Sequence, residues 1–186
     1  ILIDSSINSP RATPVQPRAI GAAMVSAKAA RGGSTIGELR QSGAMKLLFP
    51  RPDPALLQTI VINTAGGITG GDSFTLNARA EAQAALSLTT QAAERAYRAQ
   101  PGQVAALRNT LTVDSGATLH WLPQESILYD GCALRRHLTV DLAQDASLLL
   151  VEPLVFGRAA MGEALRHAYF RDRIEVNRAG QPLFHD

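Results

Sequence analysis

The chain is poor in several residue types that mark specialised protein classes. Its single cysteine, Cys132, excludes an internal disulfide and favours a reducing compartment, so we expect a cytoplasmic location. No apolar run approaches the ~18 residues that a membrane span needs. The first residues lack the basic and apolar regions of a secretory signal. We therefore predict no membrane contact.

Charged residues are also scarce, at 18% of the 186 residues, and they nearly balance at a formal net charge of +2. Only two lysines occur, so almost all positive charge is arginine, which favours carboxylate pairing and protein interfaces. Aromatic residues make up only 5% and do not interleave with basic ones. This pattern argues against a nucleic-acid partner.

The remaining composition, 46% hydrophobic, supports a folded core. Three prolines in residues 1–18 predict a flexible lead-in, followed by one domain over residues 19–186. The Ala-rich stretch 19–31 predicts a short helix that ends at a glycine pair, with a strand as the alternative. A second short helix is predicted over residues 157–167.

From residue 56 onward, short alternating runs separated by turn residues predict a mainly β protein, either a sandwich, a barrel or a solenoid. The runs are residues 56–63, 74–79, 84–90, 104–116 (broken near Arg108), 118–122, 134–142, 147–156 and 169–178.

A weak internal repeat favours the solenoid. LTVD occurs at residues 111–114 and 138–141, and at the same spacing residues 127–129 match residues 154–156. Chance similarity between neighbouring strands is the alternative. A true repeat predicts stacked β rungs, each of which buries its apolar face on the next.

The stretch GGITGGD contains Gly66, Gly67, Gly70 and Gly71 and ends at Asp72. A phosphate loop would need a following lysine and helix, whereas here an acid and a strand-like run follow. We instead predict a tight turn, in which the chain reverses between two strands and Asp72 bonds nearby N–H groups.

Several acids lie in apolar surroundings, where a carboxylate is costly to bury unless it is paired or binds a metal. They are Glu94, Glu125, Asp130 and Glu152. Nearby arginines make ion pairing the plain alternative. Cys132 lies near cations that would lower a thiol pKa, which leaves a small hydrolase as another reading; an Arg-rich RNA-binding domain is a third.

Four blocks occur in order: INTAGGITGGD (62–72), LTTQAAERAYR (88–98), WLPQESILYDG (121–131) and LLLVEPLVFGRAAMGE (148–163). Together they closely resemble the UreD (UreH) family of urease accessory proteins, and RQSGAMKLLFPR (40–51) resembles its N-terminal signature. The resemblance covers about residues 35–186.

The resemblance implies a non-enzymatic scaffold with stacked, helically wound strands and few helices. It implies partners UreF, the GTPase UreG and apo-urease, no tightly bound cofactor, and Ni²⁺ in transit. The candidates for lining a nickel route are Asp72, Glu94, Glu125, Asp130, Cys132 and Glu152. Family members usually run well beyond residue 186, so the domain is expected to lack its C-terminal part.

Overall fold

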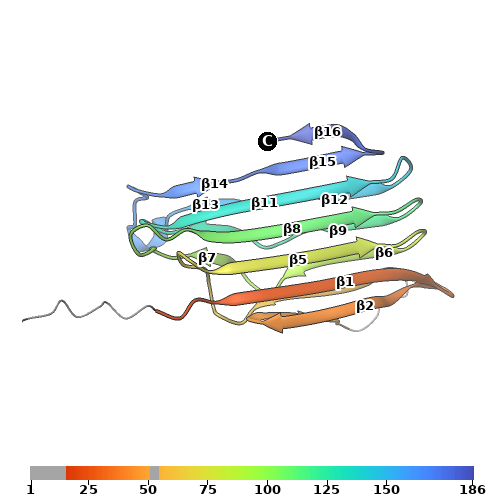
Figure 1. Cartoon of the computed structure of the whole chain (residues 1–186), viewed down its shortest axis with the longest axis horizontal. Helices are drawn as coiled ribbons and strands as arrows, with labels where there is room; N and C mark the ends of the chain where they lie inside the picture. Colours follow the sequence, from red (N-terminus) through yellow and green to blue (C-terminus); the bar gives the residue numbers. More distant parts are fainter. Residues whose placement is uncertain (1–15, 51–54) are drawn as a thin grey trace, which may run out of the picture.

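The computed structural model describes residues 16–50 and 55–186, and nearly all regular structure in these ranges is β-strand. The strands form three sheets (Figure 1). The large sheet has the order β16-β15-β11-β8-β5-β1-β2, with β14 also pairing with β11. The middle sheet has the order β12-β9-β6-β4-β3, and the small sheet has the order β13-β10-β7.

The large sheet contains β1 (Ile20–Ala30), β2 (Gly33–Gly43), β5 (Ser73–Ala80), β8 (Ala105–Val113), β11 (Ala133–Leu142), β14 (Tyr169–Arg171), β15 (Ile174–Arg178) and β16 (Gln181–His185). The middle sheet contains β3 (Met45–Leu48), β4 (Leu57–Asn63), β6 (Ala85–Thr90), β9 (Thr118–Trp121) and β12 (Ser147–Leu150). The small sheet contains β7 (Glu94–Ala96), β10 (Ser126–Leu128) and β13 (Leu154–Phe156).

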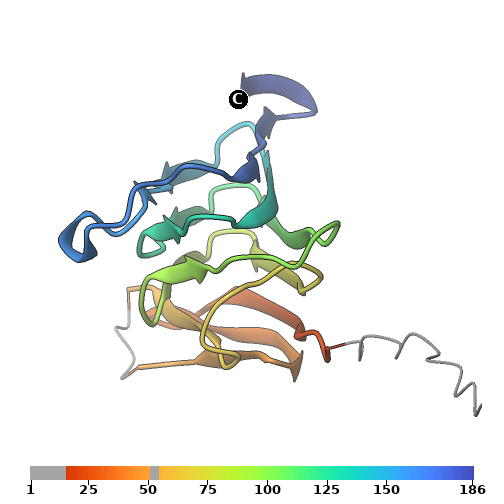
Figure 2. The ribbon, with the colours of Figure 1, turned by 90° about the vertical axis from the view of Figure 1, so that its left-hand side faces the viewer.

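The chain visits the large, middle and small sheets in turn, so each circuit forms one coil of a β-solenoid. Three successive coils are β5-β6-β7, β8-β9-β10 and β11-β12-β13. Equivalent strands of successive coils pair in parallel in all three sheets. Figure 2 shows these coils stacked on one another. The predicted mainly β, solenoid-like fold is confirmed.

The stacking follows from alternation along each strand. In β8, Leu111 and Val113 point into the solenoid and are fully buried, whereas Thr112 between them is not. The facing strands of the middle sheet contribute Leu86, Leu88 and other apolar residues to the same core. Each strand therefore buries one face inside its own coil and pairs its backbone with the coils above and below.

The predicted repeat is present, but the register predicted for its two copies is wrong. Leu111 pairs with Val140, not with Leu138, so the two LTVD segments lie two residues out of step. A register shift of two residues keeps every side chain on the same face of the sheet, so the two segments still have the same inward and outward pattern. In the small sheet Ile127 pairs with Val155, one residue away from the predicted partner.

Neither predicted α-helix forms. Residues 19–31 contain β1, which pairs with β2 on one side and β5 on the other, so the strand alternative holds. In residues 157–167 only a short 3₁₀ helix forms, Ala159–Met161. Gly157 and Gly162 both have φ near +70° there, which a right-handed helix cannot include. The break predicted near Arg108 is also absent, since β8 is continuous.

The predicted lead-in, residues 1–18, lies almost wholly outside the described residues. Within the described ranges, no helix is long and apolar enough to cross a membrane.

Candidate functional site

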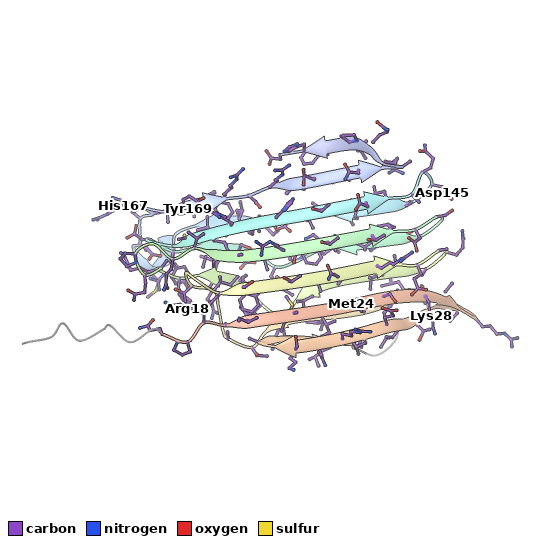
Figure 3. All side chains as sticks on the ribbon, in the orientation of Figure 1. Arg18, Met24, Lys28, Asp145, His167 and Tyr169 are labelled. Atoms are coloured by element: carbon purple, nitrogen blue, oxygen red, sulfur yellow. The ribbon has the colours of Figure 1, made fainter. Side chains whose placement is uncertain are left out.

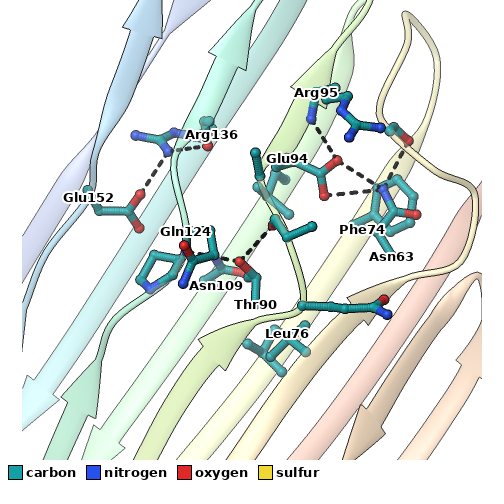
Figure 4. A pocket seen from close by; sticks show the side chains of 18 of the residues that line it. Asn63, Phe74, Leu76, Thr90, Glu94, Arg95, Asn109, Gln124, Arg136 and Glu152 are labelled. Carbon is teal, nitrogen blue, oxygen red and sulfur yellow. Dashed lines mark hydrogen bonds and ion pairs between the residues drawn. The ribbon is translucent and has the colours of Figure 1, made fainter.

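A pocket of about 200 Å³ lies inside the solenoid and extends across several coils (Figure 4). Its apolar lining comes partly from inward-facing residues of the large sheet, such as Phe74, Leu76, Leu107 and Leu138. Its polar lining lies near the small sheet and includes Glu94, Asn63, Glu152, Arg136 and Asp172. The pocket therefore joins carboxylates that come from different coils.

Glu94 begins β7 and points into the pocket (Figure 4). Both of its carboxylate oxygens accept from Asn63 Nδ2 at 3.2 Å. No salt bridge to Glu94 occurs among the described residues. Burial raises the pKa of Glu94, and the hydrogen bond from Asn63 offsets this only in part. Glu94 is thus a partly dehydrated carboxylate without a fixed cationic partner.

A second carboxylate group of the pocket surrounds Arg136. This arginine is on the inward face of β11 and is only 7% exposed. It donates to Glu152 Oε2 at 2.7 Å, to Ser126 Oγ at 3.1 Å and to both carboxylate oxygens of Asp172. One buried cation therefore serves two carboxylates.

Glu152 also accepts a hydrogen bond from Trp121 Nε1 at 2.6 Å. Burial raises the pKa of Glu152, against the lowering effects of Arg136 and of the Trp121 bond. We call Arg136, Glu152, Asp172 and Trp121 the Arg136 cluster.

The structure separates the other candidates from this pocket. Glu94 and Glu152 line it, whereas Asp72, Glu125, Asp130 and Cys132 do not. Among the described residues, no three His, Cys, Asp or Glu side chains gather closely enough to hold a metal ion. Two of the six residues predicted to line a nickel route, Glu94 and Glu152, thus share this pocket.

Asp130 has a structural role. Its Oδ1 accepts from the backbone N–H groups of Arg166 and His167, both at 2.9 Å, and its Oδ2 accepts from Arg98 at 2.7 Å. These bonds lower its pKa, the N–H of His167 most strongly. Asp130 thereby fixes the segment that follows the 3₁₀ helix, which projects from the stack in Figure 2.

Cys132 is 2% exposed, and burial raises the pKa of its thiol. A buried thiol with a raised pKa is a poor nucleophile at neutral pH. The reading of the chain as a cysteine hydrolase is therefore not favoured.

The sequence predicted that the GGITGGD stretch reverses the chain between two paired strands. The structure does not show this arrangement. The stretch connects β4 of the middle sheet to β5 of the large sheet. Ile68 within it pairs in parallel with Ala96 of β7, so the stretch takes the place of a small-sheet strand ahead of the β5-β6-β7 coil. Gly67 is required by close packing, because a Cβ there would lie 2.2 Å from Tyr97 Cε2.

Asp72 stabilises the end of this stretch. It is 5% exposed, and its two carboxylate oxygens accept from the N–H groups of Ala19 and Thr69, both at 2.8 Å. This is the turn-capping arrangement that Asp favours. The acid after the glycines thus joins the start of β1 to the turn before β5.

Sequence reasoning missed Asp172 and Asn63, and it named Arg136 only as one of five arginines available for ion pairing. Arg136 was detectable in principle, because it lies in phase with Leu134 and Leu138 and so occupies an inward position of its strand. Asp172 and Asn63 gave no such signal, since their partners lie about 30 residues or more away.

The fold and the pocket together define a β-solenoid whose largely apolar interior contains a pocket with buried carboxylates and one buried arginine. The chain belongs to the family described as UreD urease accessory protein, which residues 19–186 match.

Curated relatives agree. The urease accessory protein UreD of Roseobacter denitrificans is 53% identical over 176 residues, which cover 94% of this chain and 64% of the relative. The UreD proteins of Ruegeria pomeroyi and Ruegeria sp. are 56% and 57% identical, over 82% and 91% of this chain and 60% and 57% of theirs. The chain thus spans less than two thirds of the length of these relatives.

Proposed function

We propose that the chain is a non-catalytic scaffold for urease maturation in the cytoplasm. It assembles with UreF, the GTPase UreG and apo-urease, and it helps to deliver Ni²⁺ to the urease active site. Membership of the UreD family supports the link to urease. The observation that carries the nickel part is the internal pocket, which brings Glu94 and Glu152 from different coils to one cavity.

The chemistry of the pocket suits a metal cargo in transit better than a resident metal. Carboxylate and amide oxygens, as on Glu94 and Asn63, are ligands for divalent ions. At the other carboxylate group, Arg136 already neutralises Glu152 and Asp172, so an entering cation must compete with the guanidinium. Few free donors and a competing internal cation keep metal affinity low, which allows release.

Co-purification tests the scaffold role. The chain is expressed with UreF, UreG and apo-urease, and urease activity is measured after nickel is added. We expect a retained complex and a gain of activity over the same mixture without the chain. If no partner is retained by this chain or by a version extended at its C-terminus, the scaffold assignment is wrong.

Glu94→Gln and Glu152→Gln test the pocket, each in the assembled complex. Glu38→Gln, an exposed carboxylate on β2, is the matched control. We expect both pocket variants to keep the complex but to slow nickel-dependent activation, and the control to do neither. Unchanged activation in the combined Glu94→Gln/Glu152→Gln variant would remove the pocket from the nickel route and leave the scaffold role intact.

A further inference from the structure

A second hollow, of about 210 Å³, lies on the large sheet across β8, β11 and β14. We call it the arginine hollow. It is lined by Ala106, Leu107, Arg108, Arg135, Arg136, His137, Arg171 and Arg173. Arg108, Arg135 and Arg171 are exposed, in contrast to Arg136, whose side chain points into the solenoid. The hollow lies near the end of the strands where Tyr169 is labelled in Figure 3.

Basic residues of this hollow lie opposite one another on paired strands. Arg135 on β11 is in direct register with Arg171 on β14, and Arg108 on β8 is in register with His137. Like charges on directly opposed positions of paired strands destabilise a sheet. Their presence side by side therefore needs a balancing anion.

The protein itself supplies little of that balance. Within the described ranges, Arg136 pairs inside the solenoid with Glu152 and Asp172, and Glu175 bonds to His137 at 2.6 Å and to Arg173 at 2.5 Å. Arg108, Arg135 and Arg171 form no salt bridge with any described residue. Arg173 Nε is buried and has no hydrogen-bond acceptor in the described structure. This unpaired donor is costly, but it is shielded from solvent and so is not open to an external ligand.

One member of the hollow is already oriented for binding. Arg135 donates from Nε to Tyr169 Oη at 3.1 Å and stacks on the same ring at 5.6 Å. This contact fixes the guanidinium plane and leaves its terminal nitrogens free to form a two-pronged contact with an oxyanion. The small side chain of Ala106, next to Arg135 across the strands, leaves room above the sheet.

The layout favours several carboxylates over one phosphate. Arg108 and Arg171 are on opposite sides of β11 and two residues apart along it, so their Cα atoms lie about 11–12 Å apart from strand spacing and rise. Phosphate sites generally use convergent backbone N–H groups, whereas the N–H groups of these strands are engaged in the parallel ladders. A row of separated guanidinium groups instead matches a row of acidic side chains.

We propose that the arginine hollow is a docking site for an acidic peptide segment of a protein partner. Two or more Asp or Glu side chains of that segment pair with the exposed guanidinium groups of Arg108, Arg135 and Arg171. The net charge of the whole chain is only +2, so attraction for an acidic segment is concentrated here. This proposal does not depend on passage of nickel through the internal pocket.

The test measures fluorescence anisotropy of a fluorescein-labelled hexaglutamate peptide as the chain is added, with hexaglutamine as the neutral comparison. We expect saturable, salt-sensitive binding of hexaglutamate alone. Arg108→Gln/Arg171→Gln is expected to weaken it at least tenfold. The control Arg40→Gln, on edge strand β2 and four strands from β11, is expected to change it less than twofold.

The unfolding temperature separates binding from folding. Removal of two mutually repelling charges is expected to leave the melting temperature of the double variant unchanged or higher. Arg135→Lys, which keeps the charge but loses the planar fork, is expected to weaken binding several-fold without a loss of stability. Absence of saturable binding, or equal weakening in Arg40→Gln, overturns the proposal.

Competition identifies the class of ligand. Inorganic phosphate and an oligouridylate of equal charge are titrated against the bound peptide. We expect unlabelled hexaglutamate to displace the labelled peptide at a lower concentration than either competitor does. Tighter binding of the RNA, or displacement by phosphate at lower concentration than by the peptide, refutes an acidic-peptide site.

Discussion

Replacement of Arg136 by methionine tests how strongly the interior depends on one cation. Methionine keeps much of the volume of the side chain but leaves Glu152 and Asp172 without their buried partner. Removal of one partner from a buried ion pair typically costs 3–5 kcal/mol. For a chain of this size each kcal/mol lowers the melting temperature by about 2–4 °C, so we expect a loss of roughly 6–20 °C.

The cost of Arg136→Met is expected to depend on pH. Burial already raises the pKa of Glu152 above its unfolded value, and loss of Arg136 removes an opposing effect. A carboxyl with a raised folded pKa penalises the folded state while it is ionised, and the penalty disappears as pH falls below the unfolded value. The variant should therefore recover part of its deficit between pH 7 and about 4.5.

The assay uses the protein's own fluorophore. The sequence has one tryptophan, Trp121, and it donates to Glu152 within the cluster. Urea unfolding followed by Trp121 fluorescence at several pH values gives the free energy directly. The control is Arg79→Met, which breaks an exposed pair with Asp114 and should cost under about 1 kcal/mol. A cost for Arg136→Met no larger than the control, or one that grows on acidification, would refute the reasoning.

Four further substitutions probe the turn and the pocket. Gly67→Ala places a Cβ against the Tyr97 ring at positive φ and should cost at least about 2 kcal/mol in urea unfolding, whereas Gly66→Ala, with open space but φ +78°, should cost about 1–2 kcal/mol. Asp72→Ala leaves two backbone N–H groups without acceptors and should lower the free energy of unfolding by about 1–3 kcal/mol for each. Hydrogen exchange at both N–H groups should become faster. Slow exchange at both would contradict the capping role. Glu94→Gln should be at least as stable as the parent at pH 7, because burial raises the pKa of Glu94 and so penalises the ionised carboxylate. This advantage of the variant should vanish below about pH 4.5. If the parent gains stability relative to the variant as the pH rises from 4.5 to 7, the prediction is wrong.

The stacked strands could be predicted because inward and outward residues alternate within each short segment. The register could not, because it depends on the turns: LTVD matches LTVD in sequence, yet Leu111 meets Val140. The helix over residues 19–31 was wrong for a related reason. Alanine has the highest intrinsic helix propensity, but propensity is a weak guide, and pairing with strands on both sides outweighs it.

The same distinction applies to the candidate site, where the buried acids could be predicted from the sequence but their partners could not. Glu94 and Glu152 were identifiable because a carboxylate in an apolar strand segment is costly without a partner. The partners themselves, Asn63 and Arg136, come from other coils, and the sequence does not show which residues stacking brings together. Asp130 and Cys132 were predicted on the same grounds, but in the fold Asp130 bonds to Arg98 and to two backbone N–H groups, whereas Cys132 is buried.

The two ends of the large sheet differ from those of the other sheets in one respect. Its parallel ladder is closed on both sides by an antiparallel strand, β2 on β1 and β16 on β15, and β16 includes Pro182. Parallel stacking of a second molecule in continuation of the coils is thereby blocked on that face. In the described structure, β12 and β13 remain open edges and expose Leu149, Val155 and Phe156.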